Sequence, residues 1–181
     1  VLVHATRQGR RVRIFDVEAA YLNSELREKI YVKPVPGFLE APEGHVIPLN
    51  KPLYGLKQAG HCFFLTYSKI FEEFGAVAFL KEAGIWHSQK GDRYFIMSTF
   101  VDDWCISGDD SLIDEFIEHV GKSFKIKEQE IKMNKRFLLL CMELEYTRVN
   151  DKLELRVTAD RVSKAVLERS NVPQHNPRSM P

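Results

Sequence analysis

Apolar residues fall into short blocks along the chain, and two neighbouring blocks predict a β-hairpin. Residues 94–99 and 104–107 are rich in β-branched and aromatic side chains, and Gly108 follows the second block. Between the blocks lie Phe100, Val101, Asp102 and Asp103, so we expect a tight turn with two adjacent aspartates at its tip. A shorter apolar run over 12–15 predicts a further strand, followed by a helix-prone stretch.

Two longer stretches have the three- and four-residue apolar spacing of amphipathic helices. The first begins after Gln58 and is predicted to end at a Gly75 cap, and the second is predicted to run from a Ser111 N-cap to Gly121. Helical spacing gathers apolar side chains on one face, so we expect them to form a core on the sheet face opposite the aspartates. These side chains are Phe63, Phe64, Tyr67, Ile70, Phe71 and Phe74, then Ile113, Phe116, Ile117 and Val120.

The remaining pattern completes an α/β (α+β) fold. Alternating residues over 137–147 and 153–157 predict two strands around a turn at 149–152, and a last helix is expected from about 159 to 170. The proline-rich stretch 25–48 predicts loops and extended strands.

Length and composition limit the classes of protein that fit. A chain of 181 residues with 44% hydrophobic residues makes one core, so we expect one domain or a domain with a small appendage. No apolar run is long enough to span a bilayer and no signal peptide begins the chain, so we expect a soluble, intracellular protein. Cys62, Cys105 and Cys141 are widely spaced, which favours buried thiols over disulfides or zinc ligands.

The net charge of +1 is small for a protein that binds nucleic acid, but cationic residues gather in two places. At both places a solvated surface and a phosphate contact are equally good interpretations. We expect further positive charge in neighbouring segments of a longer polyprotein. The clusters are Arg7, Arg10, Arg11 and Arg13, then Lys122, Lys125, Lys127, Lys132, Lys135 and Arg136.

Three carboxylates are the candidate catalytic groups. Two ionised aspartates at a turn repel by about 4 kcal/mol at 4 Å and an effective dielectric near 20, which favours a bound divalent cation beside Asp102 and Asp103. Asp16 ends the first predicted strand, where alone it would be a helix cap or turn former. Tyr21 five residues later, Gln58 and Gly60, and an aspartate pair beginning 86 residues on (102 − 16) instead follow the order of a reverse transcriptase.

The chain resembles the reverse transcriptases of copia-type long-terminal-repeat retrotransposons. Residues 53–58 read LYGLKQ, a sequence that is rare outside this family. The similar segments are 16–23, 26–32, 36–38, 49–59, 100–103 and the proline-rich 176–181, which together cover almost the whole chain.

The resemblance implies a palm with partial fingers and the start of a thumb. We expect a fingers-like insertion at 24–60, a palm from 12–23 and 61–136, and the palm end and start of a thumb or connection at 137–181. The first strands of the fingers are expected to precede the chain. The expected partners are RNA template, DNA primer, deoxynucleoside triphosphates and other Gag-Pol segments, without a membrane, in cytoplasmic virus-like particles with a nuclear phase.

The resemblance also assigns roles to individual residues. Asp16, Asp102 and Asp103 would hold two Mg²⁺ ions, with Mn²⁺ as a substitute, for nucleotidyl transfer. Tyr21 would be a steric gate against the 2′-hydroxyl, or otherwise a packing residue. The remaining assignments are Gln58 and Gly60 at the nucleotide or template, Phe100 and Val101 beneath the primer end, and Lys127 beside the leaving pyrophosphate.

Three segments depart from the family pattern. Glu128, Gln129 and Glu130 occupy the place of the family's Asp-Leu-Gly. Phe replaces Trp after LYGLKQ, which preserves apolar volume. The primer-grip Phe-Leu-Gly appears as Leu139, Leu140 and Cys141, and loss of its glycine affects primer placement. We therefore consider a polymerase, a decayed or domesticated palm that binds nucleic acid or protein, and a template-independent nucleotidyl cyclase, against which Tyr21 and Gln58 argue.

Overall fold

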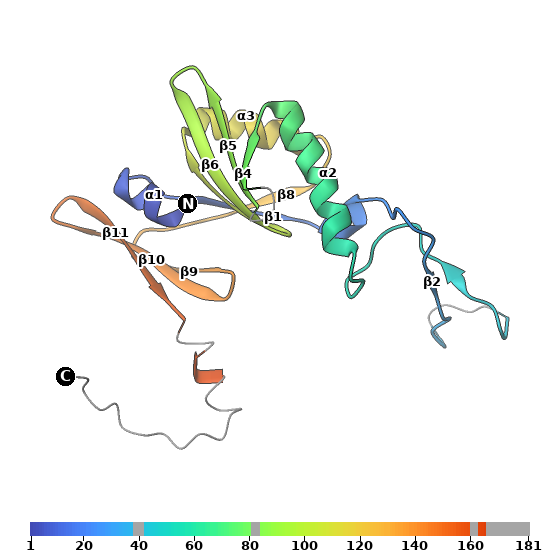
Figure 1. Ribbon diagram of the computed structural model, residues 1–181. Helices are drawn as coiled ribbons and strands as arrows, with labels where there is room; N and C mark the ends of the chain where they lie inside the picture. The colour runs from blue at the N-terminus through green and yellow to red at the C-terminus, as the bar shows by residue number, and fades with distance from the viewer. Residues whose placement is uncertain (38–41, 81–83, 160–162, 166–181) are drawn as a thin grey trace.

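A six-stranded antiparallel sheet organises the chain in the computed structural model, which describes residues 1–37, 42–80, 84–159 and 163–165 (Figure 1). Its strand order is β4-β5-β6-β7-β1-β8, so the first strand of the sequence pairs between two that come about a hundred residues later. The strands are β1 (Arg13–Val17), β4 (Val77–Leu80), β5 (Ile85–Lys90), β6 (Arg93–Phe100), β7 (Asp103–Gly108) and β8 (Ile126–Gln129).

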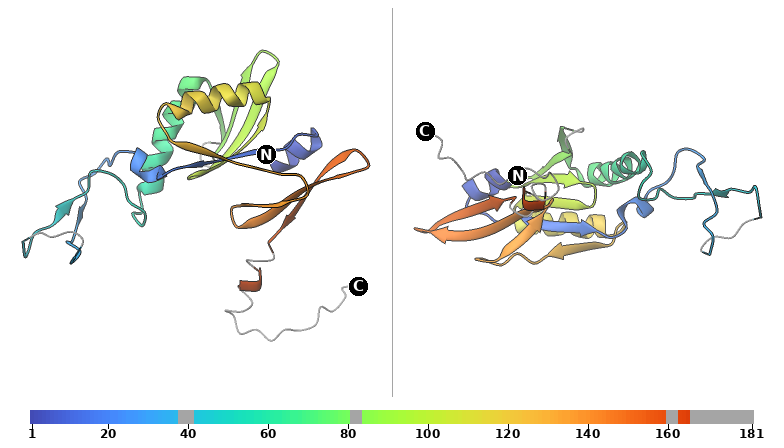
Figure 2. Two further views of the ribbon diagram at one scale, coloured as in Figure 1. Left: turned by 180° about the vertical axis from the view of Figure 1, so that it is seen from behind. Right: turned by 90° about the horizontal axis from the view of Figure 1, so that it is seen from below.

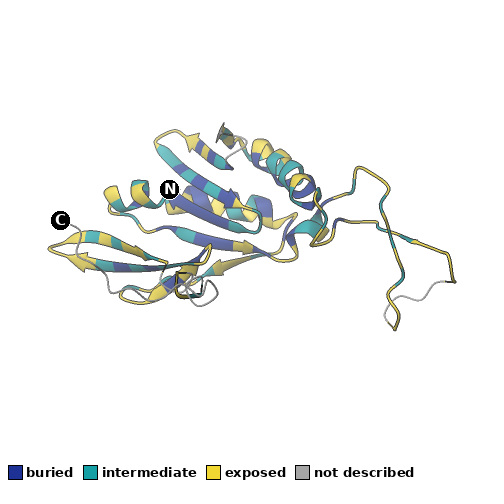
Figure 3. Ribbon diagram, turned by 60° about the horizontal axis from the view of Figure 1, so that its bottom comes forward, coloured by how far each residue is buried: buried dark blue, intermediate teal, exposed yellow. Residues whose placement is uncertain are grey.

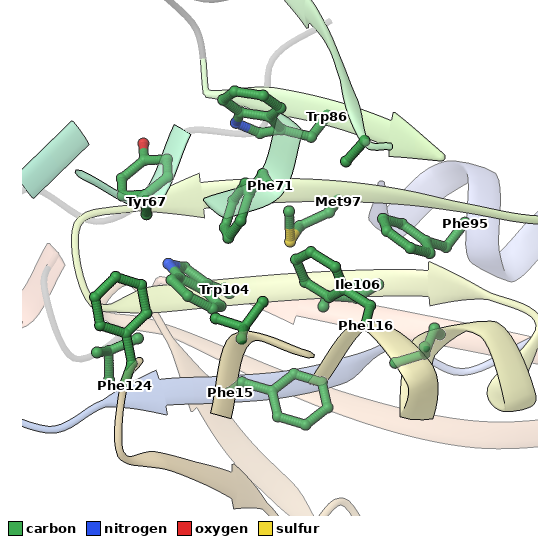
Figure 4. Close-up of a cluster of buried hydrophobic side chains, with 14 of the residues drawn as sticks. Phe15, Tyr67, Phe71, Trp86, Phe95, Met97, Trp104, Ile106, Phe116 and Phe124 are labelled. Atoms are coloured by element: carbon green, nitrogen blue, oxygen red, sulfur yellow. The ribbon is translucent and has the colours of Figure 1, made fainter. Parts of the chain in front are cut away.

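Two helices cover one face of this sheet, as the apolar spacing predicted. Side chains from α2 (Ala59–Phe74) and α3 (Asp110–Gly121) meet the sheet in a core dominated by aromatic rings (Figure 4). Phe71 lies at its centre, with ring centroids 5.2 Å from Trp86 and 5.0 Å from Trp104. Gly75 ends α2 in the left-handed conformation with φ 95°, which confirms the predicted cap.

The predicted N-cap of the second helix is wrong by two residues. Asp109 is the N-cap, in extended conformation, and its carbonyl oxygen accepts the N–H groups of Leu112 and Ile113 at 3.0 Å. The Asp109 carboxylate instead accepts the Tyr94 backbone N–H at 3.0 Å, which ties the start of α3 to β6. Asp109 and Ser111 are both residue types that favour an N-cap, and the hydrogen bond from Tyr94 of β6 favours Asp109.

A three-stranded sheet packs on part of the other face (Figure 2). It has the order β11-β10-β9. Its Phe137, Leu144 and Tyr146 are buried in one cluster with Val12 and with Ile14 of β1. The helix α1 (Leu2–Arg7) adds Ala5 to this second core. The strands are β9 (Arg136–Leu139), β10 (Met142–Val149) and β11 (Lys152–Thr158).

The expected single strand over 137–147 is wrong, because a turn at Leu140 and Cys141 divides it into β9 and β10. Both turn residues have left-handed φ values, 49° and 65°. Residues 137–142 are all apolar and include no turn-forming residue, so the sequence pattern gives no sign of this turn. Cys141 is exposed, which also corrects the expectation that all three cysteines are buried; Cys62 and Cys105 are buried as predicted.

An extended arm leaves the palm between η1 (Ala20–Asn23) and α2 (Figure 1). It contains the short pair β2 (Tyr31–Val32) and β3 (Ile47–Pro48), and most of its described residues are exposed (Figure 3). This segment matches the proposed fingers insertion in position. The division of the chain into fingers, palm and thumb stays a prediction.

The mixed α/β fold with a mainly antiparallel sheet confirms the predicted class. Sequence reasoning missed α1, β4, β5 and β8, all of which are short or lack a clear period. Most of the helix expected at 159–170, and all of 176–181, lie outside the described residues. In the described part of the chain, no helix is both long and apolar enough to cross a membrane.

Candidate active site

Four side chains form a row across four neighbouring strands on the sheet face opposite α2 and α3. Phe100 of β6 pairs with Asp103 of β7, Asp103 pairs with Asp16 of β1, and Asp16 pairs with Lys127 of β8. Directly paired residues in antiparallel strands point to the same face of a sheet. Phe15 and Val17, on either side of Asp16, point into the helix-covered core instead. Four of the predicted site residues are thus brought together by strand register.

Asp16 and Asp103 occupy a closely spaced pair in this row. The Val17 N–H donates to the Asp102 carbonyl oxygen at 3.0 Å, so Val17 and Asp102 form a hydrogen-bonded pair and the next pair, Asp16 with Asp103, is not hydrogen-bonded. Such pairs have Cα atoms about 4.5 Å apart, the closer of the two antiparallel spacings. Like charges directly opposite each other destabilise a sheet, so this arrangement favours a cation between them.

The hairpin tip holds its conformation at a steric cost. Because Phe100 pairs with Asp103, the loop has only two residues, Val101 and Asp102. Val101 has φ 52°, which is rare for a β-branched residue and costs on the order of 1–3 kcal/mol. Its carbonyl oxygen accepts the indole N–H of buried Trp104 at 3.1 Å, and its side chain packs against the helix-side core. These contacts fix the turn that presents Asp102.

The three carboxylates influence one another electrostatically. Partial burial, then the charges of Asp102 and Asp16, raise the pKa of Asp103 above the ordinary value of 3.8. Oxygen donors with excess negative charge suit Mg²⁺. No three acidic, histidine or cysteine side chains within the described ranges converge closely enough to enclose an ion. Carboxylate oxygens are the ligand type that Mg²⁺ prefers, but the described geometry does not form a closed three-ligand site.

Tyr21 lies on η1 and contacts an aromatic side chain that sequence reasoning missed. Its ring centroid is 4.4 Å from that of Tyr54, a residue within the LYGLKQ segment. Tyr54 is exposed, and its pKa is raised by desolvation and by the charges of Asp102, Tyr21 and Asp16. The only sequence signal was its membership of a specific motif.

Gln58 and Gly60 lie at the start of α2, which packs beside η1. Gln58 is the N-cap, and its side chain makes no cap hydrogen bond. Gly60 is helical, and a Cβ built there meets nothing within 4 Å. The described protein atoms therefore do not require glycine at this position, and no contact links these two residues to the carboxylate row.

Most of the basic residues before and at the start of β1 form ion pairs or hydrogen bonds with other residues of the chain. Arg13 binds Glu128 through two nitrogens, at 2.7 and 2.8 Å, and Asp114 at 2.7 Å, and the hydrogen bond to Glu128 is the main reason that its pKa is raised. Arg10 pairs with Asp109 at 3.4 Å. In the second cluster Lys125 pairs with Glu18 and Arg136 with Glu143. Lys127 has no carboxylate within 4.0 Å among the described side chains.

The antiparallel sheet, the two covering helices and the carboxylates at a hairpin tip define a reverse transcriptase palm. All of residues 1–181 match the family model described as reverse transcriptase (RNA-dependent DNA polymerase), and the chain belongs to this family. The resemblance inferred from LYGLKQ and the aspartate pair is thereby confirmed.

Three relatives illustrate the similarity. The chain is 30% identical over 169 residues to a retrovirus-related Pol polyprotein from transposon TNT 1-94 of Nicotiana tabacum, covering 92% of the chain and 12% of that protein. It is 29% identical over 121 residues to the corresponding polyprotein from transposon RE1 of Arabidopsis thaliana, covering 66% and 8%. It is 30% identical over 115 residues to a putative transposon Ty5-1 protein of Saccharomyces cerevisiae, covering 62% and 37%. The chain thus spans a small part of each relative.

Proposed function

We propose that this chain is the palm of an RNA-directed DNA polymerase that forms part of a retrotransposon Gag-Pol polyprotein. The observation that supports this most strongly is the pairing of Asp16 with Asp103, which brings two carboxylates together from opposite ends of the palm sequence. RNA template, DNA primer and deoxynucleoside triphosphates are the proposed partners, and cytoplasmic virus-like particles with a nuclear phase are the proposed location.

In this proposal Asp16, Asp102 and Asp103 hold two Mg²⁺ ions, or Mn²⁺ in their place. When bound, the ions lower the pKa of the primer 3′-hydroxyl and stabilise the charge of the leaving pyrophosphate. The carboxylates orient the reacting groups because they come from a sheet and a rigid two-residue turn. Asp103 must be ionised to ligate, so its raised pKa predicts that metal affinity falls as the pH drops through that value.

The residues around the carboxylates complete the site. Lys127 is paired with Asp16 in register, and in this proposal its ammonium group neutralises or protonates the leaving pyrophosphate. Phe100 is 63% exposed beside Asp103 and offers an apolar surface to the primer end, with Val101 next to it. Tyr21 excludes a ribose 2′-hydroxyl, and Gln58 and Gly60 contact the nucleotide or template from the start of α2.

Primer extension on an RNA template tests this function. The polymerase region of the polyprotein should synthesise DNA with Mg²⁺, and Asp102→Asn should abolish synthesis. Asp151→Asn is the matched control, because it removes one carboxylate from another two-residue hairpin tip, between β10 and β11. Extension that persists in Asp102→Asn would refute the assignment.

Sugar selectivity tests the gate separately. Tyr21→Ala should accept ribonucleoside triphosphates more readily, with DNA synthesis retained. Unchanged selectivity would remove the gate role from Tyr21 and leave the polymerase assignment in place.

A non-catalytic palm that binds nucleic acid or protein is the second candidate. Two observations favour it: the turn at Leu140 and Cys141 lacks the glycine typical of the family primer grip, and several basic residues are paired internally. Nucleic-acid binding without extension, unaffected by Asp102→Asn, would support this candidate. A template-independent cyclase would instead convert nucleoside triphosphate without primer or template.

A further inference from the structure

Tyr54 is presented to solvent by a tight turn at the base of the arm. The Leu56 N–H donates to the Leu53 carbonyl oxygen at 3.2 Å, and Gly55 has φ +100°, the geometry of a turn that needs glycine at its third position. Tyr54 is the second residue of that turn and is 62% exposed. The turn therefore fixes the direction in which the Tyr54 ring leaves the backbone.

Among the described residues, the ring that contacts Tyr54 is that of Tyr21, the candidate gate. The Tyr54 and Tyr21 rings lie 4.4 Å apart at 51° to each other. Tyr21 also packs against the helix-side core, so its ring lies between that core and Tyr54. The arm is tied to the same short helix by Lys51, whose Nζ donates to the Leu22 carbonyl oxygen at 2.7 Å. Tyr54 and Tyr21 are thus held together by a side-chain contact and by a nearby backbone anchor.

Tyr54 also lies within electrostatic influence of the candidate metal ligands. Desolvation, and then the charges of Asp102, Tyr21 and Asp16, raise the pKa of its hydroxyl.

We propose that Tyr54 is a positioning residue for sugar selection: it packs on the Tyr21 ring and fixes the orientation in which Tyr21 excludes a 2′-hydroxyl. This inference rests on the proposed polymerase function. A tyrosine with one free side can rotate about χ1 and yield space to a ribose. A second ring packed on it removes that freedom, and aromatic pairs of this kind contribute enough to shift rotamer populations several-fold.

The test compares the ratio of kcat/KM for dATP over ATP in Tyr54→Ala, Tyr54→Phe and wild type. Tyr54→Ala should lower the ratio about 3- to 10-fold, mostly by lowering KM for ATP, whereas Tyr54→Phe keeps the ring and should stay within about 2-fold. In Tyr21→Ala, adding Tyr54→Ala should change nothing further, because Tyr54 acts through Tyr21. Tyr31→Ala is the control, because Tyr31 is a tyrosine of the same arm with a similar exposure of 54%.

Equilibrium binding of dATP and ATP with Mg²⁺, without primer, gives a readout that does not need turnover. Wild type should prefer dATP, and Tyr54→Ala should lose that preference while its Tm stays unchanged. Nucleotide binding with an unchanged preference in Tyr54→Ala would overturn the role of Tyr54 alone. Absence of any nucleotide binding by wild type would overturn the polymerase proposal, and the role of Tyr54 with it.

Discussion

The two faces of the six-stranded sheet are built from the same strands but have opposite chemistry. On the face toward α2 and α3, alternate residues such as Phe15, Trp104 and Met97 are fully buried among aromatic rings (Figure 4). On the other face, the residues between them include Asp16 and Asp103, which are left partly or fully exposed beyond the three-stranded sheet. The strand period of two lets one element carry stability on one face and reactive charge on the other.

The largest effects are expected from one substitution on the carboxylate face and one in the helix-covered core. Asp16→Asn should reduce DNA synthesis by at least about 10³-fold, equivalent to about 4 kcal/mol, because a metal ligand is lost. Thermal unfolding should show a Tm equal to wild type or higher. A large loss of stability in Asp16→Asn would contradict the division between the two faces.

Phe71→Ala should have the reverse effect. Its ring centroid lies within 5.2 Å of those of four other buried aromatic rings, so truncation leaves a cavity that costs about 3–5 kcal/mol of folding free energy. Urea unfolding measures this, with Phe79→Ala on exposed β4 as the control that removes the same atoms from a 71% exposed site. Equal stability of the two variants would show that the helix-covered face is not the main core.

Cys141→Gly changes the β9–β10 turn of the three-stranded sheet, which packs on the same face of the large sheet as the carboxylates. Cys141 and Leu140 both have left-handed φ, whereas the equivalent turn between β10 and β11 has Asn150 and Asp151, which tolerate it. Glycine at 141 should therefore raise stability by about 1 kcal/mol, seen as a shift in the urea midpoint. Asn150→Gly should shift it less, and equal shifts would show that Cys141 is unstrained.

Asp103→Asn tests whether the charge of this candidate metal ligand lowers the stability of the metal-free protein. The raised pKa means that folded Asp103 binds its proton more tightly than the unfolded chain, so without metal the protein loses stability as pH rises from about 3.8 through the raised value. Asparagine removes that loss, and the Tm at pH 7 without Mg²⁺ should rise by about 1–3 °C. The gain should vanish at pH 3, and a gain independent of pH would contradict this cause.

The smallest expected effect is a change in the ionisation of Tyr54. Asp102→Asn should lower the pKa of Tyr54 only part of the way toward its ordinary value of 10.0, since desolvation remains. NMR titration of ¹³C-labelled tyrosine measures this, with exposed Tyr31 as the internal reference. An unchanged pKa would place the Tyr54 hydroxyl away from the hairpin tip.

Local patterns were enough to predict the β6–β7 hairpin, α2 with its Gly75 cap and the turn at 149–152. Each depends on residues close together in sequence, whose conformational preferences act within one or two turns of chain. LYGLKQ and the aspartate pair likewise gave the family, because a motif is a local property. The error at Asp109 falls where a tertiary contact competes, because a hydrogen bond to Tyr94 ties the helix start to β6. The turn at Cys141 was missed because residues 137–142 are all apolar.

The sequence by itself therefore determined the two long helices, the β6–β7 hairpin, the family and the three candidate carboxylates. Only the tertiary structure decided that Phe100, Asp103, Asp16 and Lys127 form one row, that Arg13 is held by Glu128 and Asp114, and that Tyr54 packs on Tyr21. The physical reason is register: a shift of one residue between β1 and β7 would turn Asp16 toward the core. That register is set by packing of strands about 90 residues apart, which no local pattern encodes.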